Sequence, residues 1–269
     1  MKIIKSINKL NKEVNFKAKI GFVPTMGSLH DGHLSLIESS KKKTDKTLVS
    51  IFVNPSQFNK KKDFSSYPKN ISKDIRKLRK ARVDYVFIPT VRQIYKKNIS
   101  MKLKINKKDK VLCAKFRKGH FEGVLAVINQ LLKIIKAKYL FLGEKDFQQI
   151  YLIKKLIKKR FRTKVIPCKT KRDSHFLAYS SRNLLLNKKQ IKLARSIAKI
   201  NFDFYKLIKN KYSNISNLSN IKSKILRNGV KIEYLEIRNK NNLSKYYNKF
   251  NFKIFIAYYI NKIRLIDNF

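Results

Sequence analysis

Two histidines, His30 and His33, stand in a glycine-containing run where a predicted strand gives way to a predicted helix. Apolar residues up to Met26 are typical of a buried parallel strand, and the apolar spacing from Leu34 onward is typical of an amphipathic helix. The imidazoles therefore fall near a helix N-terminus, where free backbone N–H groups and the helix dipole favour anions. Donors placed there stabilise charge on a phosphoryl group in transfer, so the run predicts phosphoryl or nucleotidyl transfer. A histidine pair that only packs at a turn is the simpler interpretation, and spacing alone names no substrate.

Strand and helix patterns alternate through the first two thirds of the chain. Predicted strands cover 47–54, 85–89, 139–143 and 163–167, and predicted helices cover 71–82, 123–137 and 146–159. This alternation predicts an α/β fold with a Rossmann-like, doubly wound parallel sheet. Ligands of such sheets bind at the carboxyl ends of the strands, which is where the histidine pair falls.

The pattern changes in the last third of the chain. Helices are predicted from 187 to about 228, with a connecting loop at 213–220, and strands at 232–237, 253–260 and 263–266. We therefore expect a Rossmann-like, nucleotide-binding domain over 1–175 and a smaller C-terminal α+β lid domain over 176–269. The segment 171–183 is expected to cross between them.

The composition suits a globular enzyme. The chain has 269 residues, of which 43% are hydrophobic, enough to build a substantial core. A formal net charge of +49 would suit a nucleic-acid-binding protein, but the lysines are spread over nearly every predicted element instead of forming one stripe. With seven glycines and no tryptophan, the composition indicates drift toward residues with A/T-rich codons. We therefore expect no specific nucleic-acid partner.

The two cysteines and the first residues bear on the compartment. Cys113 and Cys168 lack metal-ligand spacing, so neither a disulfide framework nor a zinc site is predicted. The N-terminal residues lack the continuous apolar region of a signal peptide, and no segment reaches the ~18 uninterrupted apolar residues that span a bilayer. We expect a cytoplasmic protein without a membrane partner.

A series of short motifs follows in order along nearly the whole chain. They are Val23–Gly27 with His30–His33, Ile51–Phe58, Tyr67–Pro68, Phe116–Val124, Gly143–Gln149, Ser180–Asn183 and Arg264–Asn268. As an ordered set they resemble the pantothenate synthetase family, the pantoate–β-alanine ligases of the His-x-Gly-His nucleotidyltransferase superfamily. The resemblance implies an ATP- and Mg²⁺-dependent enzyme that works as a homodimer formed through its first domain.

The resemblance also implies a reaction in two steps. Pantoate attacks the α-phosphorus of ATP to give pantoyl adenylate and pyrophosphate, and β-alanine then attacks the acyl carbon to give pantothenate and AMP. By position in the motifs, the resemblance assigns catalysis to His30, His33 and Lys145, ATP binding to Met26, His33, Gly143, Lys145, Asp146, Ser180, Ser181 and Arg182, pantoate binding to Gln57, Gln149 and Asn54, and the metal to Asp74. Fixed donors and cations suit this chemistry, so we expect no covalent enzyme intermediate.

Several assignments have a simpler alternative. Lys145 follows a predicted strand that ends at Gly143, so its ammonium would meet the crevice, although one lysine among many is usually a solvated surface group. Asp146 can accept from ribose hydroxyls or only cap the next helix. Arg117 and His120 are expected to support the site and subunit packing more than the chemistry itself.

The chain departs from the family pattern near the expected phosphate loop. His175-Phe176 stand where the family usually has Asp-Gly, and loss of the glycine should restrict the backbone and alter loop closure. Tyr179 stands where an aliphatic residue or methionine commonly packs near adenine, so it either stacks there or reflects drift.

Two other functions compete with the ligase. A related nucleotidyltransferase with another acceptor would need a cationic acceptor site in place of Gln57 and Gln149. A repurposed basic protein that binds nucleic acid is the second alternative, and the presence of His30, His33 and Lys145 argues against it.

Overall fold

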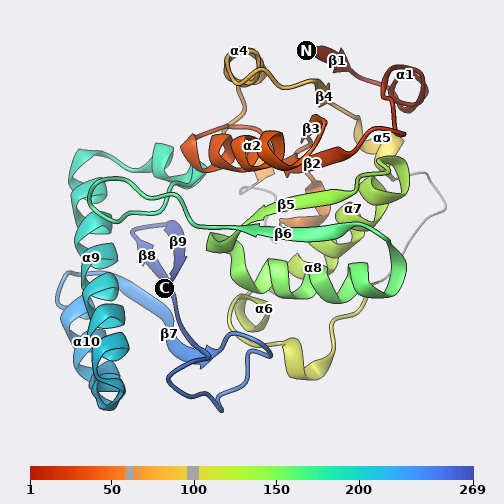
Figure 1. The fold of residues 1–269 in the computed structure, drawn as a ribbon. Helices are drawn as coiled ribbons and strands as arrows, with labels where there is room; N and C mark the ends of the chain where they lie inside the picture. The colour runs from red at the N-terminus through yellow and green to blue at the C-terminus, as the bar shows by residue number, and fades with distance from the viewer. Residues whose placement is uncertain (59–63, 66, 96–102) are drawn as a thin grey trace.

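A computed structural model describes residues 1–58, 64–65, 67–95 and 103–269 (Figure 1). Within these residues, six parallel strands form one sheet in the order β1-β4-β3-β2-β5-β6. Their bounds are β1 Lys2–Ile4, β2 Ile20–Thr25, β3 Lys46–Ile51, β4 Tyr85–Phe87, β5 Tyr139–Gly143 and β6 Lys164–Cys168. The chain runs outward from β2 to β3 and β4 on one side, and through β5 to β6 on the other. The sheet is therefore doubly wound, as predicted, with its switch point between β2 and β5.

Helices cover both faces of this sheet because its central strands are apolar on both sides (Figure 1). On one face, α2 (Asp31–Lys43) and α4 (Ile71–Lys80) pack against side chains such as Val23, Val49 and Phe141. On the other face, α1 (Ile7–Glu13), α7 (His120–Ile134) and α8 (Phe147–Arg160) share a core with Phe22, Leu48 and Leu140. Successive side chains along each strand are thus buried under the helices on opposite faces of the sheet.

The last third of the chain forms a second, smaller layered unit. α9 (Lys188–Asn210) and α10 (Leu218–Leu226) pack on an antiparallel sheet of β7 (Lys231–Asn239), β8 (Phe252–Ile260) and β9 (Ile263–Asn268). A buried apolar cluster that includes Ala194, Ile225 and Ile254 fills the space between helices and sheet. The α/β class with a smaller α+β part is therefore confirmed, while the predicted division between 175 and 176 stays a prediction.

Most predicted elements occur, with shifted ends and some additions. α7 begins at His120, ahead of the predicted start, because Gly119 takes a left-handed φ of 81° and ends the preceding segment. The predicted loop at 213–220 is wrong, since a 3-10 helix over Tyr212–Asn217 leads directly into α10. Strand β1 and the short helices α5 (Val91–Ile94) and α6 (Cys113–Phe116) were not predicted. None of the helices in the described ranges combines the length and apolarity needed to cross a bilayer.

Candidate active site

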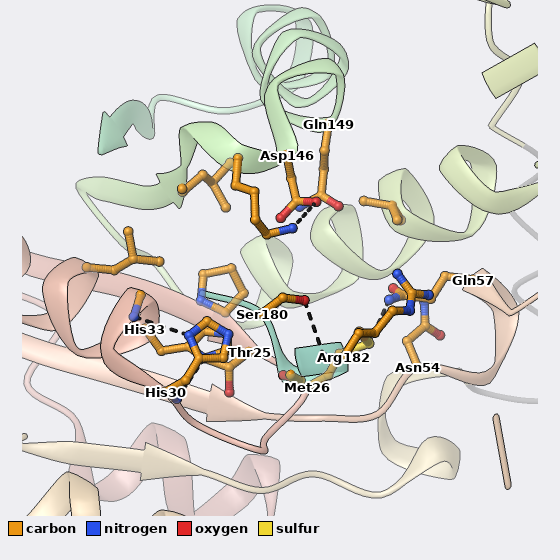
Figure 2. Close-up of a pocket in the computed structure, with 18 of the residues that line it drawn as sticks. Thr25, Met26, His30, His33, Asn54, Gln57, Asp146, Gln149, Ser180 and Arg182 are labelled. Carbon is orange, nitrogen blue, oxygen red and sulfur yellow. Dashed lines mark hydrogen bonds and ion pairs between the residues drawn. The ribbon is translucent and has the colours of Figure 1, made fainter. Parts of the chain in front are cut away.

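A cavity of about 250 Å³ lies at the carboxyl ends of β2, β3 and β5, beside the segment that crosses to the second unit (Figure 2). This is the edge of the sheet, next to its switch point, where doubly wound folds bind ligands. The predicted catalytic and substrate-binding residues all line this cavity, namely Met26, His30, His33, Asn54, Gln57, Gly143, Lys145, Asp146, Gln149, Ser180, Ser181 and Arg182. Asp74 does not line it.

The two histidines form a reciprocal cap at the start of α2. His30 Nδ1 accepts from the backbone N–H of Gly32 at 3.2 Å, and His33 Nδ1 accepts from the backbone N–H of His30 at 3.4 Å. Because each Nδ1 is an acceptor, each neutral ring carries its proton on Nε2 and keeps it as a donor. Burial lowers the pKa of His30 to about 4 and lowers the pKa of His33 well below its ordinary value, with further contributions from nearby Lys145 and Lys77. Both rings are therefore neutral donors at neutral pH.

Asp74 holds the turn between β2 and α2 from behind. Its carboxylate is buried, and its two oxygens accept from the backbone N–H groups of Ser28 and Leu29, both at 2.8 Å. The turn needs this support because Gly27 and Ser28 both have positive φ, 78° and 52°. The carboxylate thus serves the backbone of the histidine turn, and this placement gives no support to the predicted metal role.

Lys145 and Asp146 lie on a short 3-10 helix, Glu144–Asp146, that follows β5. Lys145 Nζ contacts Asp146 Oδ1 at 3.2 Å, and the lysine side chain is mostly buried. Asp146 stands at the N-cap position of α8, but its side chain makes no capping hydrogen bond there. Asn268 holds this turn, because its Nδ2 donates to the carbonyls of Glu144 and Lys145 at 2.9 and 2.8 Å. The sequence assigned no role to Asn268.

Gln57 lies at the end of a 3-10 helix, Pro55–Gln57, that follows β3. Its Nε2 donates to Met26 Sδ at 2.6 Å. Asn54 is almost fully buried beneath it and is engaged on both sides of its amide: Nδ2 donates to Gly123 O at 3.1 Å, and Oδ1 accepts from Tyr95 Oη at 2.8 Å. Asn54 Nδ2 also donates to Gln57 Oε1 at 3.3 Å, so the held Asn54 amide positions Gln57. The carboxamide of Gln149 has no hydrogen-bond partner among the residues described, and it points into the cavity from α8 (Figure 2).

Arg117 and His120 contribute to the cavity wall more directly than the sequence suggested. His120 Nδ1 lies 2.7 Å from Gln57 O, and His120 Nε2 lies 2.7 Å from Arg117 Nη1. A carbonyl only accepts and a guanidinium only donates, so Nδ1 carries the proton and Nε2 accepts. Burial lowers the pKa of His120 to about 3, which keeps the ring in this neutral form.

The Ser180–Arg182 turn approaches the histidines from the crossing segment. Ser180 Oγ accepts from the Arg182 backbone N–H at 3.3 Å, and Ser181 Oγ donates to Ser28 O at 3.2 Å. No carboxylate pairs with the guanidinium of Arg182 in the part of the chain that is described, and it reaches toward Asn54 and Gln57 (Figure 2). The turn thus places Ser181 against the histidine turn and the Arg182 cation on the side of the cavity that holds Asn54 and Gln57 (Figure 2).

The departure at His175-Phe176 has a structural consequence. Phe176 takes φ = 67°, a left-handed conformation that glycine adopts without strain. Asp173 holds the turn by accepting from the N–H groups of His175 and Leu177, and the Phe176 ring stacks on Phe202 with centroids 4.0 Å apart. The substitution is therefore accommodated by local packing.

Tyr179, the other departure, lines the cavity. Its ring lies 6.4 Å from that of His30, centroid to centroid, with an angle of 18° between the planes. The ring thus forms part of the cavity wall beside the histidine pair.

The fold and this site together define an α/β nucleotidyltransferase of the His-x-Gly-His type. The family model for pantoate–β-alanine ligase matches residues 2–269. A pantothenate synthetase of Francisella tularensis subsp. mediasiatica is 42% identical over 271 residues, which cover 99% of this chain and 95% of the relative. The chain belongs to the pantoate–β-alanine ligase family.

Solved structures of the family agree with this assignment. A pantoate–β-alanine ligase of Francisella tularensis, in complex with beta-gamma ATP and β-alanine, has a TM-score of 0.86 at 39% identity and covers 100% of this chain and 97% of its own. A pantothenate synthetase of Thermus thermophilus has a TM-score of 0.91 at 27% identity, over 100% and 99% of the two chains.

Proposed function

We propose that this chain joins pantoate to β-alanine with ATP, through pantoyl adenylate, and releases AMP and pyrophosphate. One observation carries the proposal: a single cavity places neutral imidazoles, a helix N-terminus and two cations beside two carboxamides. The first set suits phosphates, and the carboxamides suit a small hydroxy acid.

In the first step, a carboxylate oxygen of pantoate attacks the α-phosphorus of ATP, and the bond to the pyrophosphate leaving group breaks. Lys145 is placed to neutralise charge between the two anions, while the Nε2–H groups of His30 and His33 donate to phosphate oxygens. The neutral imidazoles keep these N–H groups through the whole step, so they can donate to the phosphate oxygens without a change of protonation state. Arg182 offers a planar fork to the departing phosphates.

The remaining contacts orient the substrates. Gly143 permits close approach to the ribose, and the Asp146 carboxylate, which makes no capping bond to α8, accepts from its hydroxyls. Gln57 and Gln149 bind the hydroxyls and carboxylate of pantoate without adding charge, and Met26 shapes that part of the cavity. Such positioning supplies a large part of the rate when little covalent chemistry falls to the protein.

In the second step, the neutral amine of β-alanine attacks the acyl carbon, and the bond from that carbon to the AMP oxygen breaks. The nitrogen gives up one proton to solvent as the amide forms. Pantothenate and AMP are the products.

We propose that Mg²⁺ arrives on the ATP phosphates. No cluster of three acidic, histidine or cysteine side chains that could hold a metal occurs among the described residues. Mg²⁺ keeps several waters and binds substrate phosphates readily, so it needs no protein cage. Where bound, it would neutralise phosphate charge.

A cytoplasmic location and a homodimer formed through the first domain, 1–175, are proposals supported by the family resemblance. Sedimentation of the purified protein tests the dimer. A species with the mass of one chain at micromolar concentration would contradict it.

Pantoate-dependent exchange of labelled pyrophosphate into ATP tests the first half-reaction. Addition of β-alanine should then release AMP and pantothenate. A folded protein that shows no exchange with pantoate would instead favour a related nucleotidyltransferase with another acceptor.

A further inference from the structure

Arg117 is a cation on the wall of the active site that lacks a carboxylate partner. The only hydrogen bond of its guanidinium in the described part of the chain is the one to the neutral ring of His120. Burial, together with the neighbouring guanidiniums of Arg182 and Arg264, lowers the pKa of Arg117 to about 10. Arg264 is compensated by Glu233, whereas Arg117 and Arg182 are not. Arg117 is half-buried, and an uncompensated guanidinium that is partly withdrawn from water is a strong site for an anion.

The support of Arg117 is rigid and is shared with Gln57. His120 receives an N–H from Arg117 on one side and donates to the Gln57 carbonyl on the other, both at 2.7 Å. The ring lies in the first turn of α7, where Gly123 lets the helix press directly against the backbone of Ser56. The guanidinium is therefore held at a set position relative to the proposed pantoate-binding amide.

A small annex opens beside the main cavity, with a volume of about 30 Å³. It shares Arg117, His120, Lys145, Asp146 and Gln149 with the main cavity. A volume of this size holds about two water molecules, which is close to the size of a carboxylate group. Its remaining walls come mainly from apolar side chains such as Leu112, Phe121, Phe147, Phe255 and Ile266.

The two acidic side chains that border the annex are already paired. Asp146 contacts Lys145, and Asp267 forms a two-pronged ion pair with Arg172 at 2.7 and 2.8 Å. The uncompensated charge at the annex is therefore that of Arg117, and it is positive.

We propose that Arg117 binds the carboxylate of β-alanine in this annex, with His120 as its positioning residue. The inference rests on the proposed function and extends it to the second substrate. In the proposed function, His30, His33, Lys145 and Arg182 already bind the phosphates and the reacting carboxylate of pantoate. The carboxylate of β-alanine is therefore the one substrate anion without a binding group. Its amine, two methylene groups away, would then reach toward the acyl carbon between Lys145 and Gln149.

The test compares Arg117→Gln with Lys115→Gln, which removes the same charge from a nearby exposed side chain outside the cavity. In Arg117→Gln, we expect the KM for β-alanine to rise by roughly 100-fold, the scale of losing a buried charge-assisted contact. Pantoate-dependent pyrophosphate exchange should stay within about threefold of wild type, since the first step does not use this contact. Lys115→Gln should match wild type in both assays.

An amine without the carboxylate separates binding from a general loss of activity. Wild type should release AMP with β-alanine far more efficiently than with n-propylamine, and Arg117→Gln should lose most of that preference. Arg117→Lys, which keeps the charge but not the fork, should lie between the two and serves as the test if Arg117→Gln does not fold.

Three results would overturn the assignment: an unchanged KM for β-alanine, a preference over n-propylamine equal to wild type, or an equal loss of exchange and of the second step. A raised KM for pantoate or pyrophosphate alone would place a different anion on Arg117. Absence of exchange in the wild-type protein would instead contradict the proposed function itself. His120→Gln adds a readout of positioning, because it should raise the KM for β-alanine by a larger factor than it lowers kcat at saturation.

Discussion

One methyl group at Gly123 should impair the site without touching a substrate. Gly123 lies in the first turn of α7, against the 3-10 helix that carries Gln57. An added Cβ would stand 2.2 Å from Ser56 O and 2.9 Å from Gln57 N. Both are backbone atoms and cannot rotate aside. Gly123→Ala must therefore shift this turn relative to α7, together with the Asn54 side chain that bonds to Gly123 O.

The expected cost to stability is modest, and the cost to catalysis is larger. Overpacking costs about 1–3 kcal/mol, while the better helix propensity of alanine returns about 1 kcal/mol. The free energy of unfolding should thus fall by about 0–2 kcal/mol. Relief of the contact requires about 1 Å of movement, since such atoms rest about 3.5 Å apart. A displacement of that size lowers reaction rates by about 100-fold, so kcat/KM for pantoate should fall by that factor.

Pyrophosphate exchange with varied pantoate measures this loss, and urea unfolding measures the stability in parallel. Gly229→Ala is the control, because no atom lies within 4 Å of its added Cβ, although its φ is positive at 71°. It should lose about 1–2 kcal/mol from backbone strain and keep wild-type kcat/KM. A Gly123→Ala enzyme with wild-type kcat/KM for pantoate would refute the view that α7 positions Gln57.

Further predictions concern the cation, the buried carboxylate and the histidines. Lys145→Ala should reduce exchange by at least ~100-fold with an unchanged melting temperature, and near-normal turnover would contradict the proposed mechanism. Asp74→Ala should lower the free energy of unfolding by about 2–4 kcal/mol, because two buried N–H groups lose their acceptor. Asp74→Asn keeps one acceptor and should leave the Mg²⁺ concentration for half-maximal activity unchanged. A large increase in that Mg²⁺ concentration would support the metal role for Asp74. His33→Ala should impair exchange more than attack of β-alanine on supplied pantoyl adenylate, and equal losses in both would argue against phosphate contact. The lowered pKa of His30, about 4, and of His120, about 3, means that the unfolded chain takes up protons first as the pH falls. The free energy of unfolding should therefore be at its full value above about pH 6.5 and fall toward pH 4, by at most about 1.4 kcal/mol per pH unit for each histidine. Urea unfolding measured from pH 8 to 4.5 that shows no such fall would contradict these pKa shifts.

Most of the first sheet could be predicted because its strands are apolar along their whole length. β2, β3 and β5 lie where the pattern placed them, within a few residues at each end. Strand β1 was missed because it is only three residues long and contains one buried side chain. The helical turn in 213–220 was missed because asparagine and serine, which dominate that stretch, favour turns as much as helices.

The active site was partly predictable for a related reason. Residues on the strand ends and on the first turns of helices reach the same edge of a parallel sheet, so their positions in sequence already bring them together. Asn268 gave no such signal, since its contact with the Lys145 turn depends on how the second unit docks on the first. Arg117 was assigned a supporting role because its sequence position shows neither the annex nor the absence of a carboxylate.

The sequence by itself determined the class of fold, the histidine pair at a helix start and the nucleotidyl-transfer chemistry, because strand, turn and helix signals are local. The tertiary structure decided which polar groups were already engaged. Asp74 accepts from the backbone of Ser28, His120 bonds to both Gln57 and Arg117, and Asn268 donates to the carbonyl of Lys145. Most of these bonds link residues far apart in the chain, so only the docking of the elements determines whether a side chain meets the backbone or the cavity.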